Sequence, residues 1–144
     1  MRFFSQEWAE AARRTVDAGP PQEGKLPTYW EWIDRARAGY TATWALGIRE
    51  SATYLVLTWK DGRCVEGTIT TRRPEADYVL AADQATWQDL RNGADPGRIV
   101  MYRGLRLEQG DVLAFFRVIY LFVESLAVLS RLPTDGPSTA APSR

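Results

Sequence analysis

The stretch DVLAFFRVIYLFVESLAVLSRL, residues Asp111 to Leu132, decides the fold of this chain. At 100° per residue its few polar side chains lie on one narrow stripe of a helix, which we expect to face solvent: Arg117, Tyr120, Glu124 and Arg131. A helix that packs on one sheet needs an apolar face of only about 100°. This segment is apolar over a much wider arc. We therefore expect it to contact its own sheet on one side and a ligand, a second subunit or a membrane on the other.

The length and charge of the chain are those of an ordinary globular domain. It has 144 residues and a formal net charge of zero. Residues 1–132 are expected to form one domain, and residues 133–144, rich in Pro, Ser, Thr and Ala, a disordered tail. A chain without excess positive charge is poorly suited to hold a phosphate backbone, so no nucleic-acid partner is expected.

The absence of histidine narrows the chemistry. The sequence contains no histidine and one cysteine, Cys64. Ser-His-Asp relays, histidine-ligated metals and cysteine-rich zinc sites are therefore excluded, and we expect no catalytic residue, no metal and no cofactor. A single cysteine, no secretory signal and charges at Arg117 and Glu124 within the most apolar stretch predict a cytoplasmic protein without a transmembrane span, although transient membrane contact remains compatible with the pattern.

Periodicity and capping residues predict the order of helices and strands. Helices are expected at 6–18, after a capping box at Thr28–Glu31, after Asp83 and after Asp95, before the long final helix. Alternation of apolar and polar residues predicts strands at 40–49, 53–59, 63–72, 77–82 and 105–108.

One turn and one glycine carry specific expectations. A three-residue loop, Lys60 to Gly62, would pair Leu57 with Val65 and keep the large apolar side chains on one face, so we expect a bulged turn there. Gly67 lies mid-strand and faces inward, which indicates either a simple bulge or the close approach of a ligand or a helix.

An ordered set of short motifs then carries a family resemblance. They are 76–80 (ADYVL), 87–90 (WQDL), Gly93, Asp95-Pro96 and 101–111 (MYRGLRLEQGD), after a start at 3–8 (FFSQEW). Together they resemble the sterol-carrier-protein type 2 family, in its short stand-alone prokaryotic form.

The resemblance implies an α+β fold: a twisted five-stranded, mostly antiparallel sheet covered by helices on one face, with a long apolar C-terminal helix. It also implies non-catalytic binding of a long-chain lipid (a fatty acid, fatty acyl group, phospholipid or sterol) in an apolar tunnel. The residues that we expect to line that tunnel are Trp44, Leu55, Leu57, Leu80, Ile99, Met101, Phe115, Ile119, Phe122, Val123 and Leu126. Arg117 could contact a carboxylate head group, since a guanidinium can make a two-point contact with a carboxylate.

Three alternatives stay open on the sequence. Each tunnel candidate could equally be a core residue, and the spare apolar face could be a partner or homodimer interface instead of a lipid wall, so the chain could be a monomer or a homodimer. A small cone-shaped isomerase or cyclase would need an inward-facing carboxylate as base. A helix-grip fold is the rival architecture, but two helices before the first strand argue against it.

Overall fold

The structure, a computed structural model, describes residues 1–102 and 104–134. Its strands are β1 (Ala42–Ile48), β2 (Thr53–Lys60), β3 (Arg63–Thr70), β4 (Tyr78–Ala82) and β5 (Arg106–Gln109). Its helices are α1 (Gln6–Ala18), α2 (Pro27–Arg37), α3 (Gln84–Arg91), α4 (Pro96–Met101), α5 (Val112–Arg117) and α6 (Ile119–Ser130). Arg103 of the family-like motif and most of the predicted disordered tail, from residue 135 on, lie outside the described residues.

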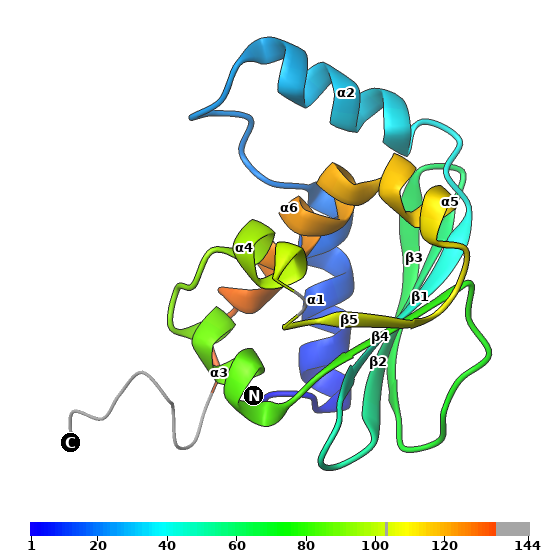
Figure 1. Cartoon of the computed structure of the whole chain (residues 1–144), viewed down its shortest axis with the longest axis vertical. Helices are drawn as coiled ribbons and strands as arrows, with labels where there is room; N and C mark the ends of the chain where they lie inside the picture. Colours follow the sequence, from blue (N-terminus) through cyan, green and yellow to red (C-terminus); the bar gives the residue numbers. More distant parts are fainter. Residues whose placement is uncertain (103, 135–144) are drawn as a thin grey trace.

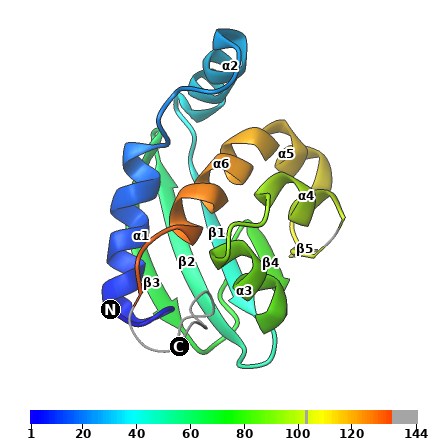
Figure 2. The ribbon, with the colours of Figure 1, turned by 90° about the vertical axis from the view of Figure 1, so that its left-hand side faces the viewer.

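The five strands form one sheet in the order β3-β2-β1-β4-β5. β1 and β4 run parallel, and the other neighbouring strands run antiparallel. The helices gather on one face of this sheet, with α1 along β3 and α6 over the central strands (Figure 1 and Figure 2). The predicted α+β fold, with a five-stranded, mostly antiparallel sheet, is confirmed.

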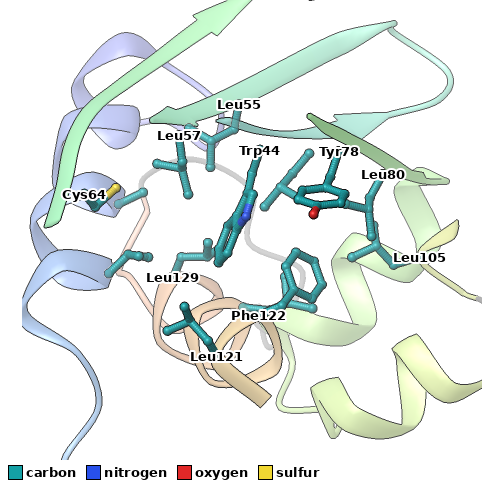
Figure 3. Packing of buried hydrophobic residues seen from close by; sticks show 14 of the residues in the cluster. Trp44, Leu55, Leu57, Cys64, Tyr78, Leu80, Leu105, Leu121, Phe122 and Leu129 are labelled. Carbon is teal, nitrogen blue, oxygen red and sulfur yellow. The ribbon is translucent and has the colours of Figure 1, made fainter. Parts of the chain in front are cut away.

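The core lies between the sheet and α6. Trp44 of β1 meets Phe122 of α6 with ring centres 5.3 Å apart, and Leu57 of β2 points into the same layer (Figure 3). Trp44, Leu57 and Phe122 have no exposed surface. Burying an aromatic or leucine side chain contributes about 1.5–3 kcal/mol, so this contact layer is the main source of stability that holds α6 on the sheet.

Four of the six helices in the described residues start after a capping side chain. Ser5, Asp83, Asp95 and Asp111 each accept a hydrogen bond from a backbone N–H in the first turn of α1, α3, α4 and α5. The predicted capping box at Thr28 is wrong, because α2 begins one residue earlier, at Pro27. Proline needs no N–H partner at the first helical position and its fixed φ suits the helix, so Pro27 starts the helix and Thr28 lies within it.

The turn between β2 and β3 also differs from the prediction. Lys60 pairs with Arg63, and Asp61 and Gly62 both have positive φ, 48° and 81°, as in a two-residue type I′ turn. On its own, a two-residue turn would place Leu57 opposite Glu66 and so mix apolar and polar side chains on one face of the sheet. A later irregularity in the pairing of β2 with β3 prevents this. The register shifts after Thr58, so Leu57 pairs with Gly67. A bulge at Val65 restores the inward face, and Val65 itself is exposed.

The predicted long C-terminal helix is interrupted at Val118. The backbone of Val118 has φ −118° and ψ 20°, outside the helical range, and separates α5 from α6. Both segments remain apolar, and Phe115 of α5 still meets Phe122 of α6 with ring centres 5.1 Å apart. α5 therefore packs on the core mainly through Phe115, with Ala114 partly buried beside the core, while Val112, Leu113 and Phe116 are exposed.

Gly67 allows α1 to lie directly on β3. A Cβ atom at Gly67 would lie 2.6 Å from the carbonyl oxygen of Ala9 and 2.9 Å from Cβ of Arg13. Of the two predicted explanations for Gly67, the close approach of a helix is the one observed.

Gly67→Ala should destabilise the protein by about 1–3 kcal/mol, because the added methyl group meets helix backbone that cannot move freely. Gly97→Ala is the matched control, since a Cβ there would have only ordinary contacts of 3.5 and 3.9 Å. Urea unfolding of both variants measures the difference, and equal stability of the two would contradict the close contact between α1 and β3.

Asp17 at the end of α1 joins three elements. Its carboxylate accepts hydrogen bonds from the Arg63 guanidinium at 2.6 and 2.9 Å, from the backbone N–H of Cys64 at 2.9 Å and from Arg37 at 3.2 Å. The hydrogen bond from Arg63, with those from the Cys64 backbone and the nearby Arg37 charge, lowers the pKa of Asp17 to about 2. The folded chain therefore stabilises the charged form of Asp17 more than the unfolded chain does.

This pKa predicts a specific loss of stability in acid. A carboxylate with a lowered folded pKa stabilises above its unfolded pKa, near 3.8, and that contribution disappears as the pH falls through about 2. The contribution is about 2 kcal/mol at neutral pH. Asp17→Asn should remove it, so the variant should lose less stability than the parent between pH 5 and pH 2 in urea unfolding. Asp89→Asn, at an exposed site, should follow the parent, and identical pH profiles for all three would refute the proposed contribution.

Candidate functional site

Most of the predicted tunnel residues meet in the core between the sheet and the terminal helices. Five have no exposed surface and two are exposed by no more than 3%. They are Trp44, Leu55, Leu57, Leu80, Phe115, Phe122 and Leu126. A passage wide enough for water would leave accessible surface on its walls. In this structure the space between the five completely buried residues is therefore filled by their own side chains.

The remaining candidates lie at the margin of that core or outside it. Ile99, Ile119 and Val123 are partly buried. Met101, at the end of α4, is exposed, and so is Arg117, at the end of α5. The structure thus brings the sheet residues and the inner side of α6 together, and leaves Met101 and the proposed head-group residue Arg117 at the surface.

α5 exposes an apolar surface. Val112 is 51% exposed, Leu113 71% and Phe116 57%, although all three are apolar. An exposed group of this kind on a small protein usually marks a place of contact with a ligand, a partner or a membrane. The second apolar face that the sequence predicted for this segment is present.

A hollow of about 470 Å³ opens between α2 and α6. Its walls are Lys25, Leu26, Thr28, Tyr29, Trp32 and Tyr120. Trp32 is 60% exposed, and its ring centre lies 6.1 Å from that of Tyr120, which in turn lies 5.3 Å from that of Tyr29. Sequence analysis missed this hollow because α2 and α6 are far apart in the chain. The available signal was that Trp30 and Trp32, two residues apart on one helix, cannot both face the core.

Glu124 of α6 lies beneath α2 instead of on a solvated stripe, so that prediction is wrong. Glu124 is only 8% exposed. The hydroxyl of Tyr29 donates to its Oε2 at 2.5 Å, and Nζ of Lys25 lies 3.0 Å from the same oxygen. The prediction that these polar residues face solvent treated the helix as isolated. In the structure α2 lies over α6 and covers Glu124, whereas Arg117 stays exposed.

The electrostatics of this contact follow from its burial. The pKa of the Tyr29 hydroxyl is raised well above its ordinary value by burial and by the hydrogen bond to the Glu124 carboxylate. Tyr29 therefore stays protonated and donates to Glu124 throughout the physiological range. The ammonium of Lys25 also lies over the Tyr29 ring, 4.8 Å from its centre, where a cation is attracted by the π system.

A second cleft has a volume of about 410 Å³. α4, α6 and the 20–25 loop form it, and Trp30, Val123, Glu124 and Arg131 are among its lining residues. Lys25 lines both spaces. Val123 is thus the predicted tunnel residue that borders this open space.

Two classes of site have no support within the described part of the chain. Among residues 1–102 and 104–134, no three His, Cys, Asp or Glu side chains come together as they would around a metal ion. No helix in the same residues has the length and apolar character needed to cross a bilayer.

Comparison with solved structures identifies the architecture. Sterol carrier protein 2 superposes with a TM-score of 0.71 at 24% identity, covering 92% of this chain and 100% of that one. This chain has the sterol carrier protein 2 fold. A conserved hypothetical protein from Thermus thermophilus, described as a candidate sterol carrier protein, superposes with a TM-score of 0.66 at 24% identity, covering 96% of this chain and 94% of that one. No protein-family model and no curated protein sequence matches the chain.

On this sterol carrier protein 2 fold, the contact at Glu124 should hold α2 in place. Glu124→Ala should destabilise the protein by about 1–3 kcal/mol, since it leaves the partly buried Tyr29 hydroxyl without its acceptor. Tyr29→Phe should cost less, about 1 kcal/mol, because Lys25 still pairs with the carboxylate. Urea unfolding provides the measurement, and Glu31→Ala, on the exposed side of α2, is the control. A Glu124→Ala variant as stable as the control would show that Glu124 does not fix α2.

Proposed function

We propose that this protein binds and carries a long-chain lipid, such as a fatty acid, a fatty acyl group, a phospholipid or a sterol, without catalysing a reaction on it. The observation that carries the proposal is the terminal pair of helices, which is apolar on two sides. One side fills the core with Phe115 and Phe122, and the other exposes Leu113 and Phe116. A purely structural helix has no need of the second side.

The fold comparison supports this proposal. The two solved structures compared above carry the name of a sterol carrier or a candidate one, and the likeness extends over nearly all of this chain. The physical chemistry agrees, because an acyl chain is bound mainly through buried apolar area, about 25 cal/mol per Å² before ordering costs. Such a site requires aliphatic and aromatic walls and no catalytic motif.

The proposed route into the predicted tunnel runs past α5. The core candidates are packed against one another, so a chain would enter only if a helix moved from the sheet. α5 is the short helix best suited to move, since the non-helical backbone at Val118 separates it from α6. The exposed Leu113 and Phe116 would then be the first apolar surface that a lipid meets.

The predicted cytoplasmic location rests on the sequence alone.

A second copy of the chain is the competing occupant of this surface. Exposed apolar side chains on α5 would serve a homodimer as well as a lipid. The two differ in what accompanies the purified protein: a lipid carrier holds an extractable long-chain molecule on a monomer, whereas an interaction subunit is a dimer without lipid.

Native mass spectrometry of the purified protein, followed by solvent extraction, tests the proposal. We expect a stoichiometric long-chain lipid, or uptake of added dodecanoate by a lipid-free monomer. A lipid-free monomer that takes up no fatty acid, fatty amine or sterol would refute lipid carriage. A lipid-free dimer would assign the α5 surface to the partner copy.

Phe116→Asp should weaken lipid binding about tenfold, because it places a charge on the proposed entry surface and removes buried area in the complex. Stability should change little, since the side chain is exposed. Val65→Asp is the matched control: Val65 is similarly exposed, at 50%, but lies on β3. Equal lipid affinity in the two variants, measured by isothermal titration calorimetry, would exclude α5 from the binding surface.

A further inference from the structure

Exposed apolar side chains from three helical segments lie at one end of the molecule. Leu26 before α2, Trp32 of α2 and Tyr120 of α6 line one hollow, and each is at least 46% exposed. Tyr120 is the second residue of α6, and α5 just before it exposes Leu113 and Phe116. In both Figure 1 and Figure 2, α2, α5 and the start of α6 lie at the end of the molecule away from the N-terminus. We call these five side chains the α2–α5 face.

The residue types on this face are those found where proteins meet the surface of a bilayer. Trp32 and Tyr120, whose ring centres lie 6.1 Å apart, each combine an apolar ring with a polar tip. Such side chains are enriched at the boundary between water and lipid. Leu and Phe side chains on the same helices supply the apolar groups that enter the acyl region.

Arginines without acidic partners accompany the apolar groups. Arg35 follows Trp32 by one turn of α2, and Arg117 directly follows Phe116 at the end of α5. Both arginines are exposed, and neither forms an ion pair within residues 1–102 and 104–134. A guanidinium beside an exposed apolar side chain can contact a lipid phosphate while its neighbour enters the membrane.

Most carboxylates near the α2–α5 face are already hydrogen-bonded inside the protein. Glu124 is buried beneath α2, Asp34 accepts from the 20–25 loop at 2.9 Å, and Asp111 accepts from backbone N–H groups in the first turn of α5. Glu31 is exposed and has no such partner in the described part of the chain. Lys25 is half exposed, and its ammonium has donors left besides the one that contacts Glu124. Three outward-facing cations therefore stand against one free carboxylate.

We infer that the α2–α5 face docks this protein on an anionic lipid bilayer. Its apolar side chains enter the boundary between head groups and acyl chains, and Arg35 and Arg117 contact lipid phosphates. A second copy is a poorer occupant, because joining two such faces would bring two sets of unpaired arginines together. The inference goes beyond lipid carriage, since it assigns the surface by which the chain reaches a membrane, and it can fail while lipid carriage holds.

Trp32 makes the test direct. The other five of the six tryptophans are exposed by no more than 6%, so acrylamide quenching of the folded chain reports mainly on Trp32. With phosphatidylcholine vesicles that contain about 30% phosphatidylglycerol, we expect the emission to shift to shorter wavelength and the quenching to fall about threefold. Pure phosphatidylcholine vesicles should have a smaller effect, and added salt should weaken the binding.

Cosedimentation of variants with the same anionic vesicles identifies the face. Trp32→Ser and Leu113→Ser should each weaken binding about tenfold, because each removes apolar area that the bilayer would bury. Val65→Ser, at a similarly exposed apolar site on β3, should bind like the parent. Arg117→Gln should weaken binding about fivefold, whereas Arg72→Gln, in the exposed loop after β3, should not. Circular dichroism confirms that each variant is folded, and the arginine variants test the face if a serine variant unfolds.

Three results would overturn the docking face. The first is failure to bind anionic vesicles, or equal binding to vesicles with and without phosphatidylglycerol. The second is a dimer in which Trp32 is protected from acrylamide without vesicles, which would assign the face to a second copy. The third is protection of Trp32 by monomeric dodecanoate but not by vesicles, which would make the hollow a site for single lipid molecules. A stoichiometric lipid extracted from protein that ignores vesicles would overturn the docking face alone and leave lipid carriage standing.

Discussion

The structure depends on the contact of α6 with the central strands. The ring centres of Trp44 and Phe122 lie 5.3 Å apart, and neither side chain has any exposed surface. Because α6 contacts the sheet through Trp44 and Phe122 and also contacts α2, its position sets where α2 can lie. The interruption at Val118 is compatible with this contact, since it lets α5 turn outward while Phe115 remains in the same layer.

Glu124 links α6 to α2 through its contacts with Tyr29 and Lys25. A carboxylate on the outer side of an apolar helix is costly to bury unless it is paired, and here two groups from the N-terminal region pair with it. The same pairing holds the N-terminal end of α2 over α6 and leaves the exposed Trp32 above Tyr120. The hollow is therefore a product of the anchoring contact: the groups that fix α2 also determine the charge at one end of the open apolar space.

The local parts of this fold could be predicted from the sequence, and the non-local parts could not. Capping residues gave the starts of three helices, at Ser5, Asp83 and Asp95, and alternation gave all five strands, because both signals act between residues close in the chain. The β2–β3 register was mispredicted because two arrangements keep the apolar side chains on the same face of the sheet. One is a three-residue turn, and the other is a two-residue turn followed by a bulge at Val65, which is the one observed. The break at Val118 had no sequence signal such as proline or glycine.

The candidate site was only half predictable for the same physical reason. A helical wheel identifies which side of α6 is apolar and so gave the core residues, but it assumes that a polar stripe faces water. Whether it does depends on Tyr29 of α2 and on Lys25 just before α2, which lie 95 and 99 residues from Glu124 in the chain. A lysine in a Pro/Gly-rich loop and a tyrosine in the first turn of a helix carry no sign of a distant carboxylate partner. The apolar core of this fold can therefore be anticipated from composition, whereas the partners of a buried charge such as Glu124 require the folded arrangement.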